Sequence, residues 1–353
     1  MKKLIFKIIV ILITIILFFI MGEIIVRVLG VFHDPNFHEW QFGQSSNLKL
    51  SQELKPNSKG HLRGSYVKIN SQGLRDYEYL LQKPNNTFRI AVIGDSYTFG
   101  WGVNLPDTYP KILEKKLNQN FNINYEVINF GVPGYNLVMY KEILEKKVLK
   151  YDPDLIIIGL LDGDIDCLES CCCSGDLINA TSYIFHEKYE IPTPGILLES
   201  YFIRFLKMNY NGFLENTGIR KPTDWLGIGL FDKDFLTWKS AQDNFKKIKE
   251  ITDKPIMILI LPDMTYKFHF KNLKFYPFEK QLAQLKEELK KDNFYIADPI
   301  EEYRQYVDNV SLLIINSNKY KEDGHPSPFA HNILANTLYN ELINYSLVSK
   351  TNP

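Results

Sequence analysis

The chain has 353 residues, of which 45% are hydrophobic and 23% charged, as is usual for a folded protein with one large or two small domains. Its 41 basic residues balance its 41 acidic residues, so net charge gives no indication of a nucleic-acid partner. Aromatic residues make up 14%, which suits either a thick core or a cleft for carbohydrate or lipid. Composition does not distinguish these two explanations.

The N-terminal segment is a candidate membrane anchor. After a basic start (MKK), the chain is apolar from Leu4 to Gly22 except for Lys7. A helix over this stretch would be about 28 Å long, close to the hydrocarbon thickness of a bilayer. A cleaved signal peptide, which would leave a soluble enzyme, fits less well because no A-x-A-like site follows. We expect an anchor at residues 1–27 of a single-pass cell-membrane protein, with the rest of the chain extracytoplasmic.

The remainder of the chain divides into a lead-in and one large domain. Residues 28–85 are polar and interrupted by Pro and Gly, which predicts a stalk and lead-in segment. Residues 86–348 alternate between short apolar runs and amphipathic stretches, which predicts an α/β domain with a mostly parallel central sheet between helices. The expected strands are 89–93, 125–130, 155–158, 256–261 and 294–297, and the expected helices are 111–118, 137–149, 278–291 and 328–343.

Residues 166–235 interrupt this alternation and predict an insertion, used as a lid or a substrate-recognition segment. The insertion contains all four cysteines, Cys167, Cys171, Cys172 and Cys173. Their spacing does not match a zinc site, since no second ligand pair lies at a suitable distance. We favour a loop with unpaired thiols, and a local disulfide is the alternative in an extracytoplasmic domain. The sequence predicts no metal and no organic cofactor.

Gly94-Asp95-Ser96 follows directly on the first expected strand. A small residue before a serine at a strand end lets the chain turn sharply and presents the hydroxyl group in the cleft. A serine hydroxyl is a weak nucleophile unless a neighbouring base removes its proton. On this segment alone, a purely structural role in turning the chain and capping a helix is equally open.

A candidate base lies near the other end of the chain, in Glu322-Asp323-Gly324-His325. A carboxylate beside a histidine can fix its tautomer and stabilise its imidazolium form, which a general base for serine requires. We favour Asp323 as this acid, with Glu322 as the alternative. His331, which has no such pattern, is expected to be a structural hydrogen-bonding residue.

Taken together, these segments resemble the SGNH/GDSL hydrolase family. Residues 94–100 (GDSYTFG) match its nucleophile block, 129–136 (NFGVPGYN) its second block, and 70–76 and 100–110 the flanks of membrane-anchored bacterial members. The resemblance implies a flavodoxin-like three-layer α/β/α fold. It also implies Ser96 as nucleophile, His325 as base, Asp323 (alternatively Glu322) as acid, and the N–H groups of Ser96 and Gly131 as oxyanion donors.

The third block departs from the family. Members usually have Gly-x-Asn-Asp, whose Asn side chain donates to the oxyanion, whereas Gly163 occupies the Asn position here and is only a third oxyanion candidate. Losing one such donor can lower the rate by about 10²–10³. The resemblance implies an ester hydrolase or acyltransferase acting on acylated envelope polysaccharide or lipid. The alternative is a catalytically impaired envelope protein kept for binding or assembly.

Overall fold

The computed structural model describes residues 2–28, 42–43, 50, 53–165, 236–264, 279–315 and 323–348. The predicted insertion at 166–235, its cysteines and Glu322 lie outside the described residues. Helix α1 (Lys2–Val28) belongs to one compact unit, and the α/β sheet with its helices belongs to another.

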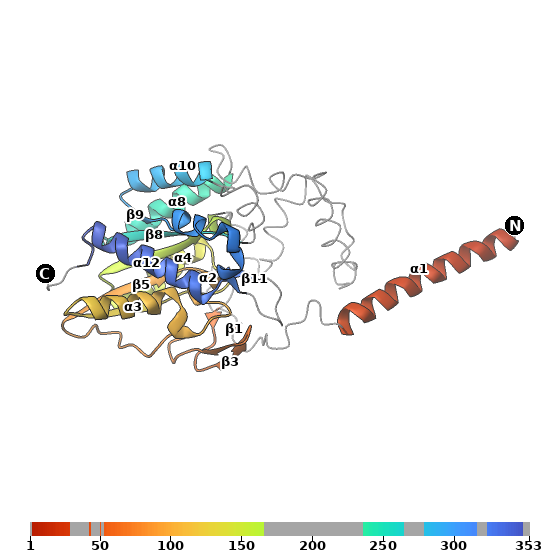
Figure 1. Cartoon of the computed structure of the whole chain (residues 1–353), viewed down its shortest axis with the longest axis horizontal. Coiled ribbons are helices and arrows are strands. Elements are labelled where there is room, and N and C mark those ends of the chain that lie inside the picture. Colours follow the sequence, from red (N-terminus) through yellow and green to blue (C-terminus); the bar gives the residue numbers. More distant parts are fainter. Residues whose placement is uncertain are drawn as a thin grey trace. The chain divides into compact units, whose positions relative to one another are not determined.

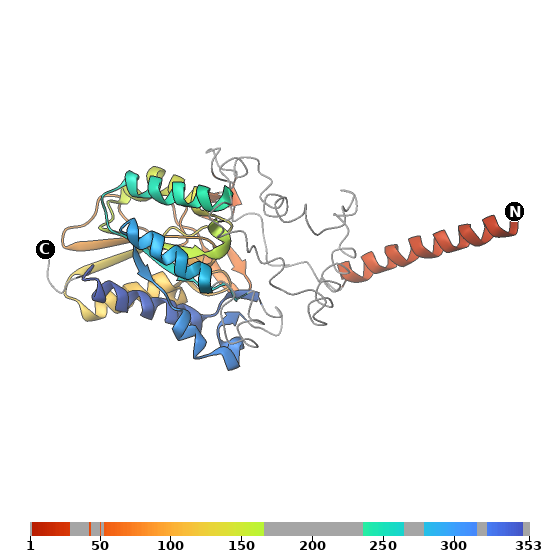
Figure 2. The same ribbon diagram turned by 90° about the horizontal axis from the view of Figure 1, so that it is seen from above.

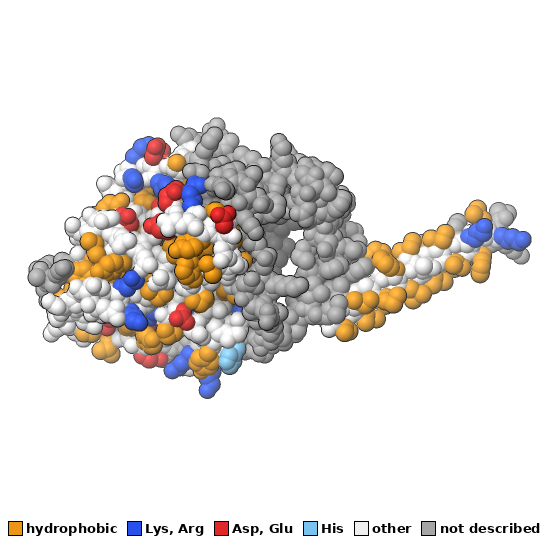
Figure 3. Space-filling model, in the orientation of Figure 1, with side chains coloured by type: hydrophobic (Ala, Val, Ile, Leu, Met, Phe, Trp, Pro, Cys, Tyr) orange, Lys and Arg blue, Asp and Glu red, His pale blue; other side chains and the backbone are white. Residues whose placement is uncertain are grey.

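Helix α1 has the properties expected of the N-terminal segment. Its stretch from Lys3 to Ile25 has a mean hydropathy of 3.2, and its hydrophobic side chains are exposed along its length (Figure 3). The helix is therefore long and apolar enough to span a membrane or to act as a signal sequence.

The core of the second unit is a five-stranded parallel sheet with the order β6-β5-β7-β8-β9. Its strands are β5 (Thr87–Ile93), β6 (Asn124–Asn129), β7 (Leu155–Leu161), β8 (Ile256–Leu261) and β9 (Tyr295–Ala297). Strands β7 and β8 are almost entirely buried, as their unbroken hydrophobic sequences require. This is the flavodoxin-like 2-1-3-4-5 order, so the predicted fold class is confirmed.

Helices cover both faces of the sheet (Figures 1 and 2). On one face α3 (Tyr109–Asn120) packs against α12 (Pro328–Asn344). The other face carries α4 (Leu137–Lys146), α8 (Leu236–Ile251) and α10 (Glu279–Lys291). The sequence analysis did not predict α8, and it extended the helix after residue 137 to 149. The short elements are α2 (Ser96–Phe99), η2 (Leu105–Asp107), η3 (Val148–Tyr151), η4 (Asp162–Ile165), α11 (Ile300–Arg304), η7 (Val307–Leu312), β10 (Ile314–Ile315) and β11 (Asp323–Pro326).

The segment before the sheet is folded together with it. Strands β1 (Phe42–Gly43) and β2 (Glu53–Leu54) form one antiparallel pair, and β3 (Lys59–Leu62) and β4 (Ser65–Lys68) form a hairpin. Arg75 and Asp76 follow the hairpin and are only 1% and 5% exposed. Residues 53–85, set apart as a lead-in by the sequence analysis, thus pack in the same compact unit as the sheet.

Candidate active site

Ser96 lies at the carboxyl end of β5, where the chain turns directly into the short helix α2. Asp95 caps this helix, with its Oδ1 accepting the Tyr97 N–H at 2.9 Å. The helix rests on the sheet because Gly94 and Gly131 have no side chain. A Cβ atom would lie 1.9 Å from Thr98 Oγ1 at the first position and 2.4 Å from Phe99 N at the second. Ser96 is therefore held at the point where connections leave β5 in opposite directions, the usual site location in such sheets.

His325 is brought to Ser96 from the C-terminal part of the chain. It lies in β11, which packs beside α2 (Figure 1). His325 Nε2 is 2.9 Å from Ser96 Oγ, across a separation of 229 residues. The structure thus joins the two residues that the sequence analysis singled out, within hydrogen-bonding distance for proton transfer. Their catalytic roles stay predictions.

Two aromatic side chains that the sequence analysis did not consider surround the imidazole ring. The Trp101 ring is stacked on it, with centroids 5.3 Å apart and planes 21° apart. The Tyr97 ring is tilted against it at a centroid distance of 5.4 Å, and the Tyr97 hydroxyl donates to the Gly324 carbonyl at 3.0 Å. His325 is therefore contacted by the segment that carries the serine.

The carboxyl group closest to Ser96 in sequence is buried. Asp95 Oδ2 accepts a long hydrogen bond from Ser96 Oγ at 3.4 Å. Burial raises the pKa of Asp95 to about 6, although the Tyr97 N–H and the charge of His325 lower it. The predicted acid of the base is a different residue. The backbone of Asp323 lies in β11, but its side chain and the alternative Glu322 lie outside the described residues, so this assignment stays a prediction.

The three oxyanion candidates differ in their surroundings. The Ser96 N–H, at the start of α2, has no backbone partner within the described part of the chain, as is usual for the first turn of a helix. The Gly131 N–H donates to Asn129 Oδ1 at 2.8 Å, so it could serve an oxyanion only by giving up that partner. Gly163 is exposed, and none of the described residues comes within 4 Å of the position a Cβ would take. The roles of all three stay predictions.

Arg75 supports the C-terminal end of α2, a function that the sequence analysis did not assign. Its guanidinium group donates to the carbonyl groups of Phe99 at 2.9 Å and Val103 at 2.5 Å, and also to that of Gly100. Burial lowers the pKa of Arg75 to about 9, while Asp76 raises it. Carbonyl groups at the end of a helix have no partner within the helix, and Arg75 satisfies that of Phe99 at the end of α2.

Asp76 and Asn129 support the loop beside the serine. Asp76 Oδ2 accepts the Asn129 N–H at 2.7 Å, and Oδ1 forms an ion pair with the buried Lys111 at 2.9 Å. The Asn129 side chain donates to the Thr98 carbonyl at 2.8 Å while its oxygen accepts the Gly131 N–H. Asn129 therefore connects α2 to the loop that follows β6.

His331 has the structural role expected of it. It is fully buried, and its Nδ1 accepts the Tyr109 N–H at 3.2 Å. Burial lowers the pKa of His331 to about 3, so the ring is neutral and can accept this hydrogen bond.

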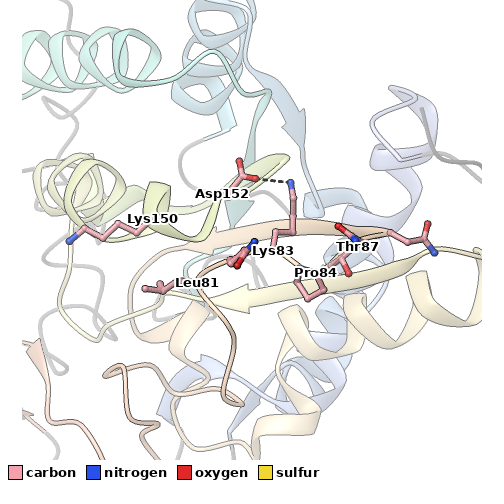
Figure 4. A pocket seen from close by; sticks show the side chains of 9 residues that line it. Leu81, Lys83, Pro84, Thr87, Lys150 and Asp152 are labelled. Atoms are coloured by element: carbon pink, nitrogen blue, oxygen red, sulfur yellow. Dashed lines mark ion pairs between the residues drawn. The ribbon is translucent and has the colours of Figure 1, made fainter.

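A hollow lies elsewhere, at the amino end of β5 (Figure 4). Residues 81–87, Lys150 and Asp152 line it, and Lys83 forms an ion pair with Asp152 at 3.3 Å. Because Ser96 follows the carboxyl end of the same strand, this hollow is separate from the candidate site. Among the residues that the structure describes, no group of three or more His, Cys, Asp or Glu side chains could hold a metal ion.

Comparison with solved structures gives similar proteins at low identity. A lipase/acylhydrolase from Enterococcus faecalis is 14% identical, with 75% of this chain and 100% of that chain covered and a TM-score of 0.43. A catalytic mutant of an acetylxylan esterase from Geobacillus stearothermophilus is 14% identical, with 72% of this chain and 94% of that chain covered and a TM-score of 0.42. A member of the lipolytic protein G-D-S-L family from Veillonella parvula is 12% identical, with 72% of this chain and 97% of that chain covered and a TM-score of 0.38.

A search of curated protein sequences finds no match. Residues 92–160 match the model of the GDSL-like lipase/acylhydrolase family. This range begins in β5, includes Ser96 and the loop after β6, and ends in β7. The resemblance drawn from the motifs is therefore confirmed for the part of the chain that carries Ser96, which matches the GDSL-like lipase/acylhydrolase family.

Proposed function

We propose that the protein is a serine-dependent ester hydrolase with Ser96 as nucleophile and His325 as general base. The observation that carries this proposal is the 2.9 Å distance between Ser96 Oγ and His325 Nε2. A second support is the rigid setting of the serine, since Asp95 caps α2 at one end and Arg75 binds its carbonyl groups at the other. Preorganised geometry of this kind is what nucleophilic catalysis by a neutral hydroxyl group requires.

The reaction would proceed through an acyl-enzyme. His325 takes the proton of Ser96 while Oγ forms a bond to the ester carbonyl carbon, and the resulting oxyanion accepts the Ser96 N–H. The C–O bond to the leaving alcohol then breaks, and His325 returns the proton to that alcohol. In the second half, His325 takes a proton from water while the water oxygen bonds to the acyl carbon. The bond between that carbon and Ser96 Oγ then breaks, the acid leaves, and His325 returns the proton to Oγ. A sugar hydroxyl in place of water would make the same enzyme an acyltransferase.

The proposed substrates are acylated carbohydrates or lipids of the cell envelope. Their support is the apolar helix α1, which would anchor the domain at the outer surface of the cytoplasmic membrane. In this setting Asp323, or alternatively Glu322, would orient His325, and Gly131 would assist the Ser96 N–H after releasing Asn129 Oδ1.

The proposal is tested with the full chain in detergent, using p-nitrophenyl esters of increasing acyl length. Ser96→Ala and His325→Ala should both abolish the turnover of the wild-type protein. Equal background rates in the wild type and Ser96→Ala would refute ester hydrolysis. Acyl transfer to a polysaccharide acceptor would then have to be measured directly.

One observation favours the second candidate function, a binding or assembly protein without catalysis. Gly163 presents no side chain where the family usually has an oxyanion-donating Asn, and no described residue comes within 4 Å of the position a Cβ would take there. This function predicts that acylated oligosaccharides bind equally well to the wild type and Ser96→Ala, and that neither protein releases the acyl group.

A further inference from the structure

We propose that Trp101 and Tyr97 are positioning residues that hold the imidazole of His325 against Ser96. This inference rests on the proposed function and adds two residues that affect the rate at which Ser96 reacts. It begins with the backbone of His325. Among the described residues, β11 pairs with β10 through Ile314 with Pro326 and Ile315 with Asp323, and the register shifts between them. Gly324 and His325 lie in this irregularity, and irregularities of this kind redirect a side chain.

A restraint on the position of the His325 ring comes from α2 and the residue that follows its cap. Gly100 has a φ of +85°, in the left-handed region that lets the chain leave the helix, and Trp101 comes next. The Trp101 N–H donates to the Ser96 carbonyl at 3.0 Å. The backbone that carries the stacking indole is thus hydrogen-bonded to the nucleophile residue itself, so serine and imidazole share one support.

Tyr97 adds a second restraint of a different kind. Its ring is 4% exposed and contacts the imidazole, and its hydroxyl donates to the Gly324 carbonyl at 3.0 Å. Trp101 therefore limits the tilt of the ring, and Tyr97 limits movement of the backbone that carries it. The distance between His325 Nε2 and Ser96 Oγ depends on both, and an error of about 1 Å in such a contact can lower a rate by about 10²-fold.

The Trp101 stack also acts during the reaction. When His325 takes the serine proton, the imidazole becomes a cation that lies over the face of an indole ring. That face carries negative charge from the π system and attracts cations. The cation exists only after proton transfer, so this contact would lower the barrier and leave substrate binding unchanged.

The first test measures the rate at which a fluorophosphonate labels Ser96 in the full chain in detergent, with the maximal rate separated from the affinity. We expect Trp101→Leu to lower the maximal rate by about 10-fold or more. Trp101→Phe, which keeps an aromatic face, should recover most of the loss, and Tyr97→Phe should cost about 5-fold. Phe121→Leu and Tyr345→Phe, at aromatic contacts with Tyr339 and Tyr295, are the matched controls and should react like the wild type.

The second test reads the position of the imidazole without catalysis. The seven histidines are labelled with ¹³C in a Ser96→Ala background, and the His325 ring signals are identified by their loss in His325→Asn. Stacking predicts an upfield ring-current shift of these signals that Trp101→Leu removes and the control variants retain. An absent shift, or labelling rates in both site variants equal to those of their controls, would overturn the proposal. If wild-type Ser96 does not react at all, the proposed function fails. The ring-current shift alone then decides whether Trp101 and Tyr97 hold the His325 ring.

Discussion

Restoring a side chain at position 163 offers a direct test of the oxyanion site. Gly163 lies in the turn η4, which Asp164 holds in place because its Oδ2 accepts the Leu161 N–H and the Tyr140 hydroxyl, both at 2.8 Å. In the part of the chain that the structure describes, a Cβ atom at Gly163 would have nothing within 4 Å. Gly163→Asn should therefore fold, and it should gain up to about 1 kcal/mol of stability because the unfolded chain loses conformational freedom.

The expected effect on activity follows from the chemistry of the amide group. If position 163 faces the oxyanion as it does in the family, Gly163→Asn adds one hydrogen-bond donor to the transition state. Removing such a donor from a serine hydrolase lowers kcat by about 10²–10³, so adding one to an incomplete site should raise kcat by about 10-fold or more. KM should change little, because the oxyanion exists only after attack.

The assay compares kcat for p-nitrophenyl acetate in three variants. Gly163→Asp has nearly the shape of Asn but no N–H donor, and Gly163→Ala reports the change in the backbone alone. Only Gly163→Asn should exceed the wild type, and Ser96→Ala should cancel the gain. Equal kcat values for all three substitutions would refute the reasoning, since they would show that position 163 does not reach the oxyanion.

Three further predictions concern the free energy of unfolding, measured with urea in detergent. Arg75→Ala should lower it by about 3 kcal/mol or more, because several buried carbonyl groups lose their donor, and a loss below about 1 kcal/mol would contradict that role. Asp95→Asn keeps a capping oxygen and removes a carboxyl whose pKa is raised to about 6 by burial. The stability contributed by such a group is present below pH 4 and lost as the pH rises through 6, so the variant should be more stable by roughly 2–3 kcal/mol at pH 7 and equal at pH 4. The pH dependence due to His331 has the opposite sign, because burial lowers its pKa to about 3. The free energy of unfolding of the wild type should fall as the pH falls from 6.5, and that of His331→Phe should change less with pH.

The fold could be predicted from the sequence because hydrophobic runs and helical periodicity are local signals. All five sheet strands were expected within a few residues of their observed bounds, and their alternation with helices implied the parallel order. Helix α8 was missed although it buries Ala241, Phe245 and Ile248 at helical spacing. Its N-terminal end directly follows the predicted insertion, and without a clear start signal the pattern was not assigned.

The site was predicted only where a local motif carried it. Ser96 and His325 each stand in a recognisable segment, so their meeting could be anticipated from the resemblance. Arg75 and Trp101 lie in the matched flanking segments, but the match assigned them no function, because that function depends on carbonyl groups and a ring that come close only in the folded chain. The sequence could not show either that the Gly131 N–H already has a partner in Asn129. These contacts depend on tertiary packing, which no spacing along the chain encodes.

Segments far apart in the sequence hold different parts of the site around Ser96. Arg75 and Asp76, from before the sheet, hold the end of α2 and the start of the following loop, so the serine cannot move without moving both. His325 is held on the other side by Trp101, whose backbone is bound to Ser96 itself. The Ser96–His325 distance thus depends on side chains other than these two residues themselves. A GDSL motif alone would not set that distance, and the residues around it decide whether the serine is reactive.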